Sequence, residues 1–268
     1  MDSRSTALRD ILLPMGRVAV AFSAGVDSTF LLRFAAEVLG RENVLAVVGD
    51  SPSLPRAELD GAKDLAESFG VELVTVYPGE MRNPQYAANP PDRCYFCKQA
   101  LFAEVRAAAQ ARGIETVLDG GNAEDASDWR PGRRAAAELG VRSPLLEAGL
   151  GKTDIRELSQ ALGLPTADKP AMACLASRLP YGTAITTEAL AMVEAAEADL
   201  RGRGLRQVRV RHHGELARLE TAPAEMARFD DPAFRAAVSA SLHRLGYRYV
   251  ALDIDGYRTG SLNASLTP

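Results

Sequence analysis

Three cysteines are the residues whose spacing first suggests chemistry. Cys94 and Cys97 form a Cys-x-x-Cys pair, and Cys174 follows much later. An odd, small number of cysteines argues against a disulfide framework. Residues three apart lie on one side of a helix, so both thiols of the pair could reach one metal centre. Spacing alone leaves four possibilities open: three unrelated thiols, a redox dithiol, an iron–sulfur cluster on three thiolates, or a zinc site completed by Cys174 and one of His212, His213 or His243.

A second candidate site is the stretch AFSAGVDSTFLL at residues 21–32. The apolar run before it predicts a buried strand, and the apolar positions after it recur at helical spacing. A loop between a strand and a helix start presents backbone N–H groups to an anion, and serine hydroxyls add donors. The alternative is a tight turn without a ligand. The candidate anion-binding residues are Ser23, Gly25, Val26, Asp27 and Ser28.

Alternation of strands and helices predicts the fold class. We expect strands at 17–22, 44–50, 71–78 and 114–121, with helices at 27–39, 55–69 and 94–113 between them. This order predicts an α/β domain with a parallel sheet and helices on both faces. After a helix at 152–163 and an ordered Pro-rich loop at 164–182, we expect a smaller α+β unit: a helix at 187–201, strands at 206–213 and 215–220, a helical region at 223–245 and a strand at 247–255.

We place the domain boundary near residue 180. Residues 1–180 would form the nucleotide-binding domain, and residues 181–268 a C-terminal α+β domain for substrate binding or oligomerisation.

The segment DGGNAEDASDWRPGRRAA (119–136) begins where the fourth strand ends. Ligands of open α/β sheets bind beyond the carboxyl ends of the strands. Carboxylates there can hold hydrated Mg²⁺, and arginines can clamp phosphate. We therefore expect Asn122, Asp125 and Arg130 to face the anion loop, and GDSPSLPR (49–56) to hold an adenosine; a solvated polar loop with helix caps is the alternative.

The anion loop carries a resemblance. Its Ser-Ala-Gly-Val-Asp-Ser resembles the S-G-G-x-D-S signature of the PP-loop ATP pyrophosphatases. That resemblance implies an enzyme that binds ATP, releases pyrophosphate and leaves AMP on a substrate, with Asp27 organising Mg²⁺ and pyrophosphate. Ala24 stands where the family usually has glycine; the departure is one methyl, and it is tolerated if this residue has an ordinary negative φ.

A more specific resemblance covers nearly all of the first 182 residues. The stretches FSAGVDS, RCYFCK, DGGNAEDASDWRPG, RSPLLEAGLGKTDIRELSQALGLP and KPAMACLASRLPYG resemble the LarE family of ATP-dependent sulfur transferases. That family makes the nickel-pincer nucleotide cofactor of lactate racemase. The resemblance implies a substrate of pyridinium-3,5-biscarboxylic acid mononucleotide, whose carboxylates become thiocarboxylates.

The family supplies sulfur in two ways. Either one cysteine, here Cys174, gives up its own sulfur, or three cysteines hold a [4Fe-4S] cluster with an open iron. Because Cys94 and Cys97 accompany Cys174, we interpret this chain as the cluster type, with these thiols and Asp27 as the catalytic set. Lys169 and Arg178 flank Cys174 and would favour its thiolate.

A short basic stretch, RGRGLRQVRVRHH (201–213), lies in the smaller unit. Arg209 and Arg211 share one strand face, and with Arg258 they could bind the substrate's 5′-phosphate, in a homo-oligomer as the family implies. The alternatives are a solvated strand face and an RNA surface like that of PP-loop tRNA thiolases. A net charge of −4 and few neighbouring aromatics favour a small nucleotide over nucleic acid.

The N-terminal residues lack a signal-peptide pattern, and no stretch approaches the ~20 apolar residues that span a bilayer. We therefore expect a cytoplasmic protein without a membrane partner. A non-catalytic nucleotide or metal sensor would keep the same loop, but it would not turn ATP over.

Overall fold

The computed structural model describes residues 3–126, 131–170 and 173–258. The chain divides into two compact units. The first unit contains Met1–Asn83 and Asp92–Met172, and the second contains Pro84–Pro91 and Ala173–Pro268. The boundary near residue 180 stays a prediction.

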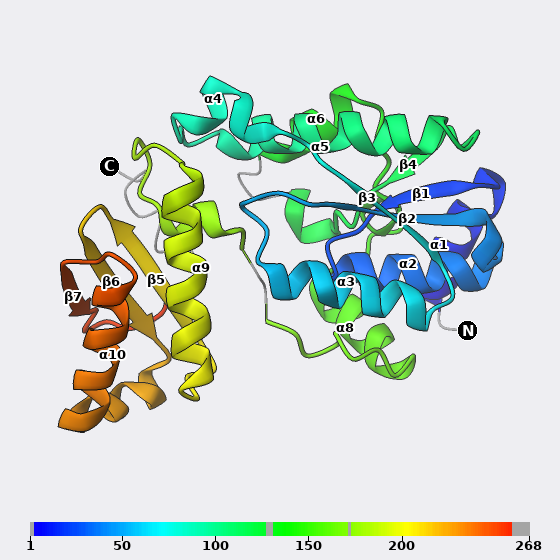
Figure 1. Ribbon diagram of the computed structural model, residues 1–268. Helices are drawn as coiled ribbons and strands as arrows, with labels where there is room; N and C mark the ends of the chain where they lie inside the picture. Colours follow the sequence, from blue (N-terminus) through cyan, green and yellow to red (C-terminus); the bar gives the residue numbers. More distant parts are fainter. Residues whose placement is uncertain (1–2, 127–130, 171–172, 259–268) are drawn as a thin grey trace. The chain divides into compact units, whose positions relative to one another are not determined.

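A four-stranded parallel sheet forms the centre of the first unit (Figure 1). Its order is β3-β2-β1-β4, so β1 lies between its sequence neighbour β2 and the last strand β4. The parallel pairing confirms the predicted fold class. The strands are β1 (Val18–Ala21), β2 (Val44–Gly49), β3 (Glu72–Val76) and β4 (Thr116–Leu118).

Helices cover both faces of this sheet, as the apolar central strands β1 and β2 require. Val18 and Val20 of β1 point into one core, and Ala19 between them points into the other. The first core is closed by α1 (Ser3–Leu12), α2 (Val26–Leu39), α3 (Arg56–Ser68), α7 (Pro144–Glu147) and α8 (Lys152–Ala161). The second is closed by α5 (Arg93–Gln110) and α6 (Pro131–Glu138). Short 3₁₀ turns η1 (Leu13–Met15), η2 (Arg41–Asn43), η3 (Glu80–Arg82) and η4 (Ala123–Ala126) lie in the connections.

The second unit is built on a three-stranded sheet of order β5-β6-β7. The hairpin β5–β6 is antiparallel and turns at Gly214 (φ 64°), whereas β6 and β7 are parallel. Apolar residues of α9 and α10 pack with those of the sheet to form its core. Its elements are α4 (Pro84–Ala87), η5 (Leu175–Arg178), α9 (Thr187–Gly202), β5 (Val208–His213), β6 (Leu216–Thr221), η6 (Pro223–Asp230), α10 (Pro232–Arg244) and β7 (Tyr249–Leu252).

The helical region predicted at 223–245 is two elements, η6 and α10. They separate at Asp231, whose side chain accepts a hydrogen bond from the N–H of Ala233 (2.9 Å). Pro232 then occupies the first helical position, where its missing N–H costs nothing. Local capping chemistry thus starts a new helix inside an apolar-periodic stretch.

Asn89 attaches the segment 84–91 to the second unit. Its side-chain amide donates to the carbonyls of Pro180 (2.8 Å) and Thr183 (2.9 Å), and Asn89 is fully buried. The N–H of Ile185 also donates to the carbonyl of Ala87 (2.8 Å). These bonds join segments about 90 residues apart.

Among the helices that the structure describes, none combines the length and apolar character needed to cross a bilayer.

Candidate functional site

The loop between β1 and α2 is stabilised by hydrogen bonds of its own serine hydroxyls. The N–H of Ser23 donates to Ser28 Oγ (3.3 Å), and the two serine hydroxyls lie 3.1 Å apart. Ser28 Oγ lies 3.3 Å from the carbonyl oxygen of Gly25, to which it donates. The start of α2 therefore lies at the carboxyl end of β1, with the first-turn N–H groups available to an anion.

Ala24 corrects one expectation about this loop. Its φ is +54°, so the condition of an ordinary negative φ, under which its methyl would be tolerated, is not met. The chain bends sharply between the strand and the helix start, and a left-handed residue makes that bend. Glycine adopts this conformation freely, whereas a residue with a Cβ pays about 1–2 kcal/mol. The departure from the glycine of the family signature is therefore less mild than expected.

The loop after β4 meets the loop that leads from β1 into α2 (residues 23–28, the anion loop above and called the phosphate loop from here on) at the switch point of the sheet. The chain proceeds from β1 through β2 to β3 on one side and returns to β4 on the other side of β1. Ligands of open α/β sheets bind where the strand order reverses in this way. At this point Asn122 Nδ2 donates to Asp27 Oδ2 (2.9 Å). The structure thus brings together two of the residues predicted for the nucleotide site.

Asn122 is oriented by the loop that carries it. Its Oδ1 accepts the N–H groups of Glu124 (3.0 Å) and Asp125 (3.3 Å), so its Nδ2 is directed to Asp27. Asp125 Oδ2 in turn accepts the N–H of Asn122 (3.2 Å). Asn122 is fully buried and Asp125 is 6% exposed. Asp27 and Asp125, two carboxylates of the kind that hard cations prefer, thus each accept a hydrogen bond from Asn122.

Of Arg130 and Arg133 in the segment 119–136, the structure describes only Arg133. Arg133 Nη1 donates to the carbonyl of Asp125 (2.8 Å) and so stabilises the loop backbone. The predicted Arg130 lies outside the described residues, as does Asp128.

Gly120 is a site residue that the sequence analysis missed. A Cβ at Gly120 would lie 3.0 Å from the backbone nitrogen of Ser28 and 3.2 Å from its Cα. Only glycine allows the loop after β4 to approach the start of α2 this closely. The Gly-Gly pair that directly follows the predicted strand was the signal available for it.

The loop after β2 is held by a side chain that is distant in the sequence, Glu80 of η3. Ser51 donates to Glu80 Oε1, and the hydroxyls of Ser51 and Ser53 lie 2.8 Å apart. Glu80 is 1% exposed, and among the described residues its Oε2 has no hydrogen-bond partner. Adenosine binding by this loop stays a prediction.

The cysteines lie on two elements. Cys94 is exposed and Cys97 half-buried in the first turns of α5, in the first unit. Cys174 is half-buried in the second unit, immediately before η5. No disulfide joins the three, all of which are described. Within the described part of the chain, no three His, Cys, Asp or Glu side chains gather as a metal site. Their shared cluster remains a prediction.

A buried ion pair fixes the backbone of Cys174. Arg178 Nη1 donates to the carbonyls of Ala173 (2.7 Å) and Cys174 (3.0 Å). The same guanidinium binds both carboxylate oxygens of Glu197, at 2.8 and 3.0 Å. Burial acts to raise the pKa of Glu197, but Arg178 and Arg201 hold that pKa below its ordinary value. The charge of Arg178 is therefore balanced by Glu197.

Two of the predicted phosphate-binding arginines, Arg209 and Arg211, are buried rather than solvated. Arg209 is 6% exposed, and burial lowers its pKa, with the nearby charge of Arg178 adding to the effect. Arg211 is 7% exposed and donates to Glu220 (2.7 Å). The alternative of a solvated strand face is therefore wrong. Arg258 is exposed and pairs with Asp255 (2.9 Å).

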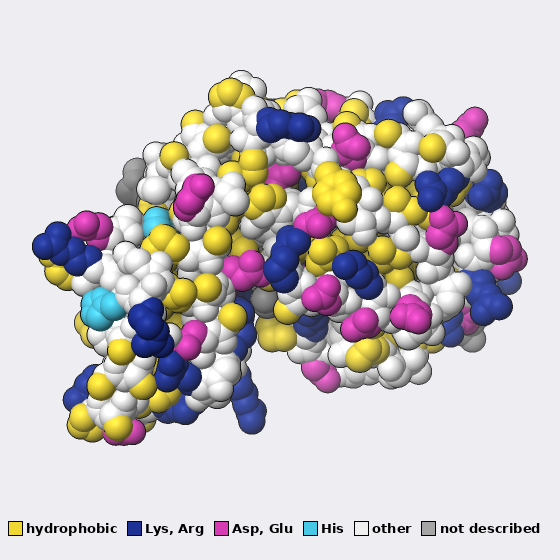
Figure 2. Space-filling model, in the orientation of Figure 1, with side chains coloured by type: hydrophobic (Ala, Val, Ile, Leu, Met, Phe, Trp, Pro, Cys, Tyr) yellow, Lys and Arg dark blue, Asp and Glu magenta, His cyan; other side chains and the backbone are white. Residues whose placement is uncertain are grey.

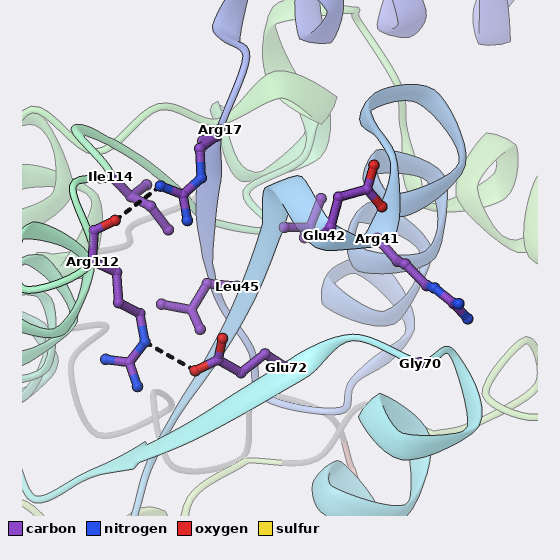
Figure 3. A pocket seen from close by; sticks show the side chains of 9 residues that line it. Arg17, Arg41, Glu42, Leu45, Gly70, Glu72, Arg112 and Ile114 are labelled. Atoms are coloured by element: carbon purple, nitrogen blue, oxygen red, sulfur yellow. Dashed lines mark hydrogen bonds and ion pairs between the residues drawn. The ribbon is translucent and has the colours of Figure 1, made fainter.

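A cavity of about 320 Å³ lies at the amino-terminal ends of the strands in the first unit's sheet (Figure 3). It borders the amino ends of the strands, beside Val44 and Glu72. Arg17 donates to the carbonyl of Arg112 (2.9 Å), whose Nε donates to Glu72 (2.9 Å). These groups stabilise the strand starts, away from the loops that follow β1 and β4.

Comparisons with known proteins agree with this geometry. The family model for NAD synthase matches residues 12–111. Pyridinium-3,5-bisthiocarboxylic acid mononucleotide synthase of Lactiplantibacillus plantarum is 40% identical over all of this chain and 96% of its own. The uncharacterized protein slr1717 of Synechocystis is 43% identical over all of this chain and 99% of its own. The tRNA-specific 2-thiouridylase MnmA of Azorhizobium caulinodans is 30% identical over 58% of this chain and 49% of its own.

The chain belongs to the LarE family. The prediction of an ATP-dependent sulfur transferase with a PP-loop is thereby confirmed. Membership in the PP-loop group also implies the use of ATP and Mg²⁺.

Proposed function

We propose that this enzyme uses ATP to convert a carboxylate of pyridinium-3,5-biscarboxylic acid mononucleotide into a thiocarboxylate, for synthesis of the nickel-pincer cofactor of lactate racemase. The observation that carries the proposal is the hydrogen bond between Asn122 and Asp27 beside the phosphate loop. The full-length similarity to a synthase of the bisthiocarboxylic acid product supports the substrate.

Activation of the carboxylate uses the phosphate loop. A carboxylate oxygen of the substrate attacks the α-phosphorus of ATP, the bond to the bridging oxygen breaks, and pyrophosphate leaves. The N–H groups at the start of α2 and the hydroxyls of Ser23 and Ser28 bind the pyrophosphate. Asp27, oriented by Asn122, would hold the accompanying Mg²⁺. Fixed donors of this kind stabilise the charge that moves onto the leaving group.

Sulfur then replaces oxygen at the activated carbon. A carboxylate resists direct attack because oxide is a poor leaving group, whereas the acyl adenylate has AMP as its leaving group. A sulfide nucleophile adds to the acyl carbon, the C–O bond to AMP breaks, and a thiocarboxylate forms. The protein contributes placement of the two reactants.

We further propose that Cys94, Cys97 and Cys174 hold a [4Fe-4S] cluster. The donor set fits, because three thiols outside any disulfide can ligate three irons and leave the fourth open. When bound, the cluster would supply a transferable sulfide.

The substrate's 5′-phosphate is assigned to the arginines of the second unit. Arg258 is exposed after β7. Arg209 and Arg211 of β5 are buried, and Glu220 balances the charge of Arg211. The C-terminal domain of residues 181–268 would bind the substrate in this way and also form a homo-oligomer. An RNA substrate fits less well, because Arg209 and Arg211 of the basic stretch are buried. On the face of the first unit in Figure 2, basic and acidic side chains are also interspersed.

Anaerobic purification with iron and sulfide assays tests the cluster. We expect about four irons per chain, lost in Cys94→Ala. Stoichiometric zinc with undiminished sulfur transfer would overturn the cluster. Loss of one sulfur's mass at Cys174 after a single turnover would favour the sacrificial route instead.

The substrate is tested by incubating the enzyme with ATP, Mg²⁺, sulfide and the biscarboxylate mononucleotide. We expect equal amounts of pyrophosphate and thiocarboxylate by mass spectrometry. Salt-dependent binding and thiolation of tRNA would favour the thiolase alternative, and the absence of any pyrophosphate would indicate a sensor.

A further inference from the structure

Lys169 connects a distant segment of the first unit to the phosphate loop. Its Nζ donates to the carbonyl of Ala24 (3.0 Å) and to Glu58 Oε2 of α3 (2.6 Å). The side chains of Lys169 and Glu58 are 25% and 13% exposed, so both are largely shielded from water. The ammonium is thus held between a carboxylate and a single backbone carbonyl of the loop.

The backbone of Lys169 is itself fixed. Its N–H donates to the carbonyl of Thr166 (2.9 Å), and its carbonyl accepts Nη2 of Arg156 (2.9 Å). Arg156 belongs to α8, which packs on the same core as α2 and α3. Lys169 therefore reaches the loop from a rigid position.

The carbonyl that Lys169 binds belongs to the residue that carries the loop's strain. Ala24 is fully buried with φ +54°. A left-handed residue directs its carbonyl differently from an extended or helical one, so a donor fixed at that oxygen favours the bent conformation over its alternatives. A hydrogen bond from a charged donor contributes enough to offset the cost of placing alanine there.

We infer that Lys169 is a positioning residue for the nucleotide: its ammonium, held by Glu58, keeps Ala24 left-handed and so keeps the N–H groups at the start of α2 aligned to bind the phosphates of ATP. The inference rests on the proposed use of the phosphate loop for ATP. It assigns no bond between Lys169 and the nucleotide.

The test compares Lys169→Met in two backgrounds. By calorimetry with ATP and Mg²⁺, without the carboxylate substrate, we expect Lys169→Met to weaken ATP binding about tenfold, or about 1.4 kcal/mol. In an Ala24→Gly background the same substitution should cost less than about threefold, because glycine needs no help to be left-handed. Glu58→Gln keeps an acceptor oxygen for the ammonium and should have a smaller effect than Lys169→Met. Lys63→Met removes an exposed lysine of α3 and is the matched control, with no change expected.

Hydrogen exchange of the peptide that spans residues 23–28 gives a second readout without ligand. We expect faster exchange in Lys169→Met and recovery on adding Ala24→Gly. Equal losses of ATP affinity in both backgrounds would mean that Lys169 contacts the nucleotide directly, and would overturn the inference. So would unchanged affinity and exchange. If the natural enzyme binds ATP but forms no thiocarboxylate, the proposed function fails while these outcomes still decide the role of Lys169.

Discussion

The hydrogen bond between Asn122 and Asp27 makes a prediction with a distinctive pH dependence. Asn122→Asp keeps an acceptor oxygen for the N–H groups of Glu124 and Asp125, but replaces the donor that faces Asp27 by a carboxylate. The Nδ2–Oδ2 distance of 2.9 Å would become an oxygen–oxygen contact between a fully buried side chain and the half-buried Asp27. Losing a hydrogen bond to a charged group costs about 1.5–3 kcal/mol. Repulsion between the carboxylates adds to that cost.

We expect Asn122→Asp to lower the free energy of unfolding by about 3 kcal/mol at pH 8 without Mg²⁺. Two carboxylates this close share a proton readily, so the folded variant takes up a proton at a higher pH than the unfolded chain does. The loss should therefore shrink as pH falls from 8 towards 5, because the folded state then binds more protons than the unfolded state. Saturating Mg²⁺ should recover part of the stability at pH 8.

Urea unfolding followed by circular dichroism measures this effect at pH 8, 7, 6 and 5. Asn122→Ala is the matched control: it also loses the bond to Asp27 but adds no charge, so its loss should not depend on pH in this range. A loss for Asn122→Asp that is the same at every pH, or absent at pH 8, would refute the placement of the amide against Asp27.

Three further predictions concern other contacts. Gly120→Ala should weaken ATP binding at least about tenfold in calorimetry, because the added Cβ meets the backbone of Ser28. Gly61→Ala on α3, whose Cβ would meet nothing within 4 Å, should leave ATP binding unchanged, and equal affinities of the two variants would contradict the close approach. Arg178→Met should lower the free energy of unfolding in urea by about 3–5 kcal/mol, because Glu197 loses its principal partner. Adding Glu197→Leu should recover part of that loss, and purely additive losses of the two substitutions would disprove the coupling. Burial and the neighbouring His213 lower the pKa of His212 below its ordinary 6.5, so the unfolded state binds more protons than the folded state as pH falls through 6.5, and stability declines. His212→Phe should therefore reduce the fall in Tm between pH 7 and 5. An undiminished fall in Tm would show that His212 is not its cause.

Local patterns in the sequence were sufficient to predict the parallel sheet of the first unit. Short β-branched runs alternating with helical periodicity predicted each strand of the parallel sheet to within a few residues. Strand ends followed by small or polar residues also located Asp27 and Asn122, because the carboxyl ends of parallel strands share one edge. The helix α1 (Ser3–Leu12) was not predicted, since only Leu8 and Leu12 among its apolar positions mark a buried stripe.

Long-range contacts decided the rest. The sequence marks Ala24 as a departure from glycine, but its positive φ follows from the bend that the sheet and α2 impose. Lys169 reaches Ala24 across 145 positions, and Asn89 binds Pro180 across 91, so neither partner can be read from neighbouring residues. Arg209 and Arg211 alternate along β5 as exposed residues would, yet the packing of the second unit buries both.

The physical reason for this division is range. Backbone propensities and side-chain periodicity act over a few residues, so the chain itself determines where strands, helices and their polar ends occur. Which of these ends meet, and which charges are shielded from water, depends on how separate segments pack, and only the folded chain fixes that.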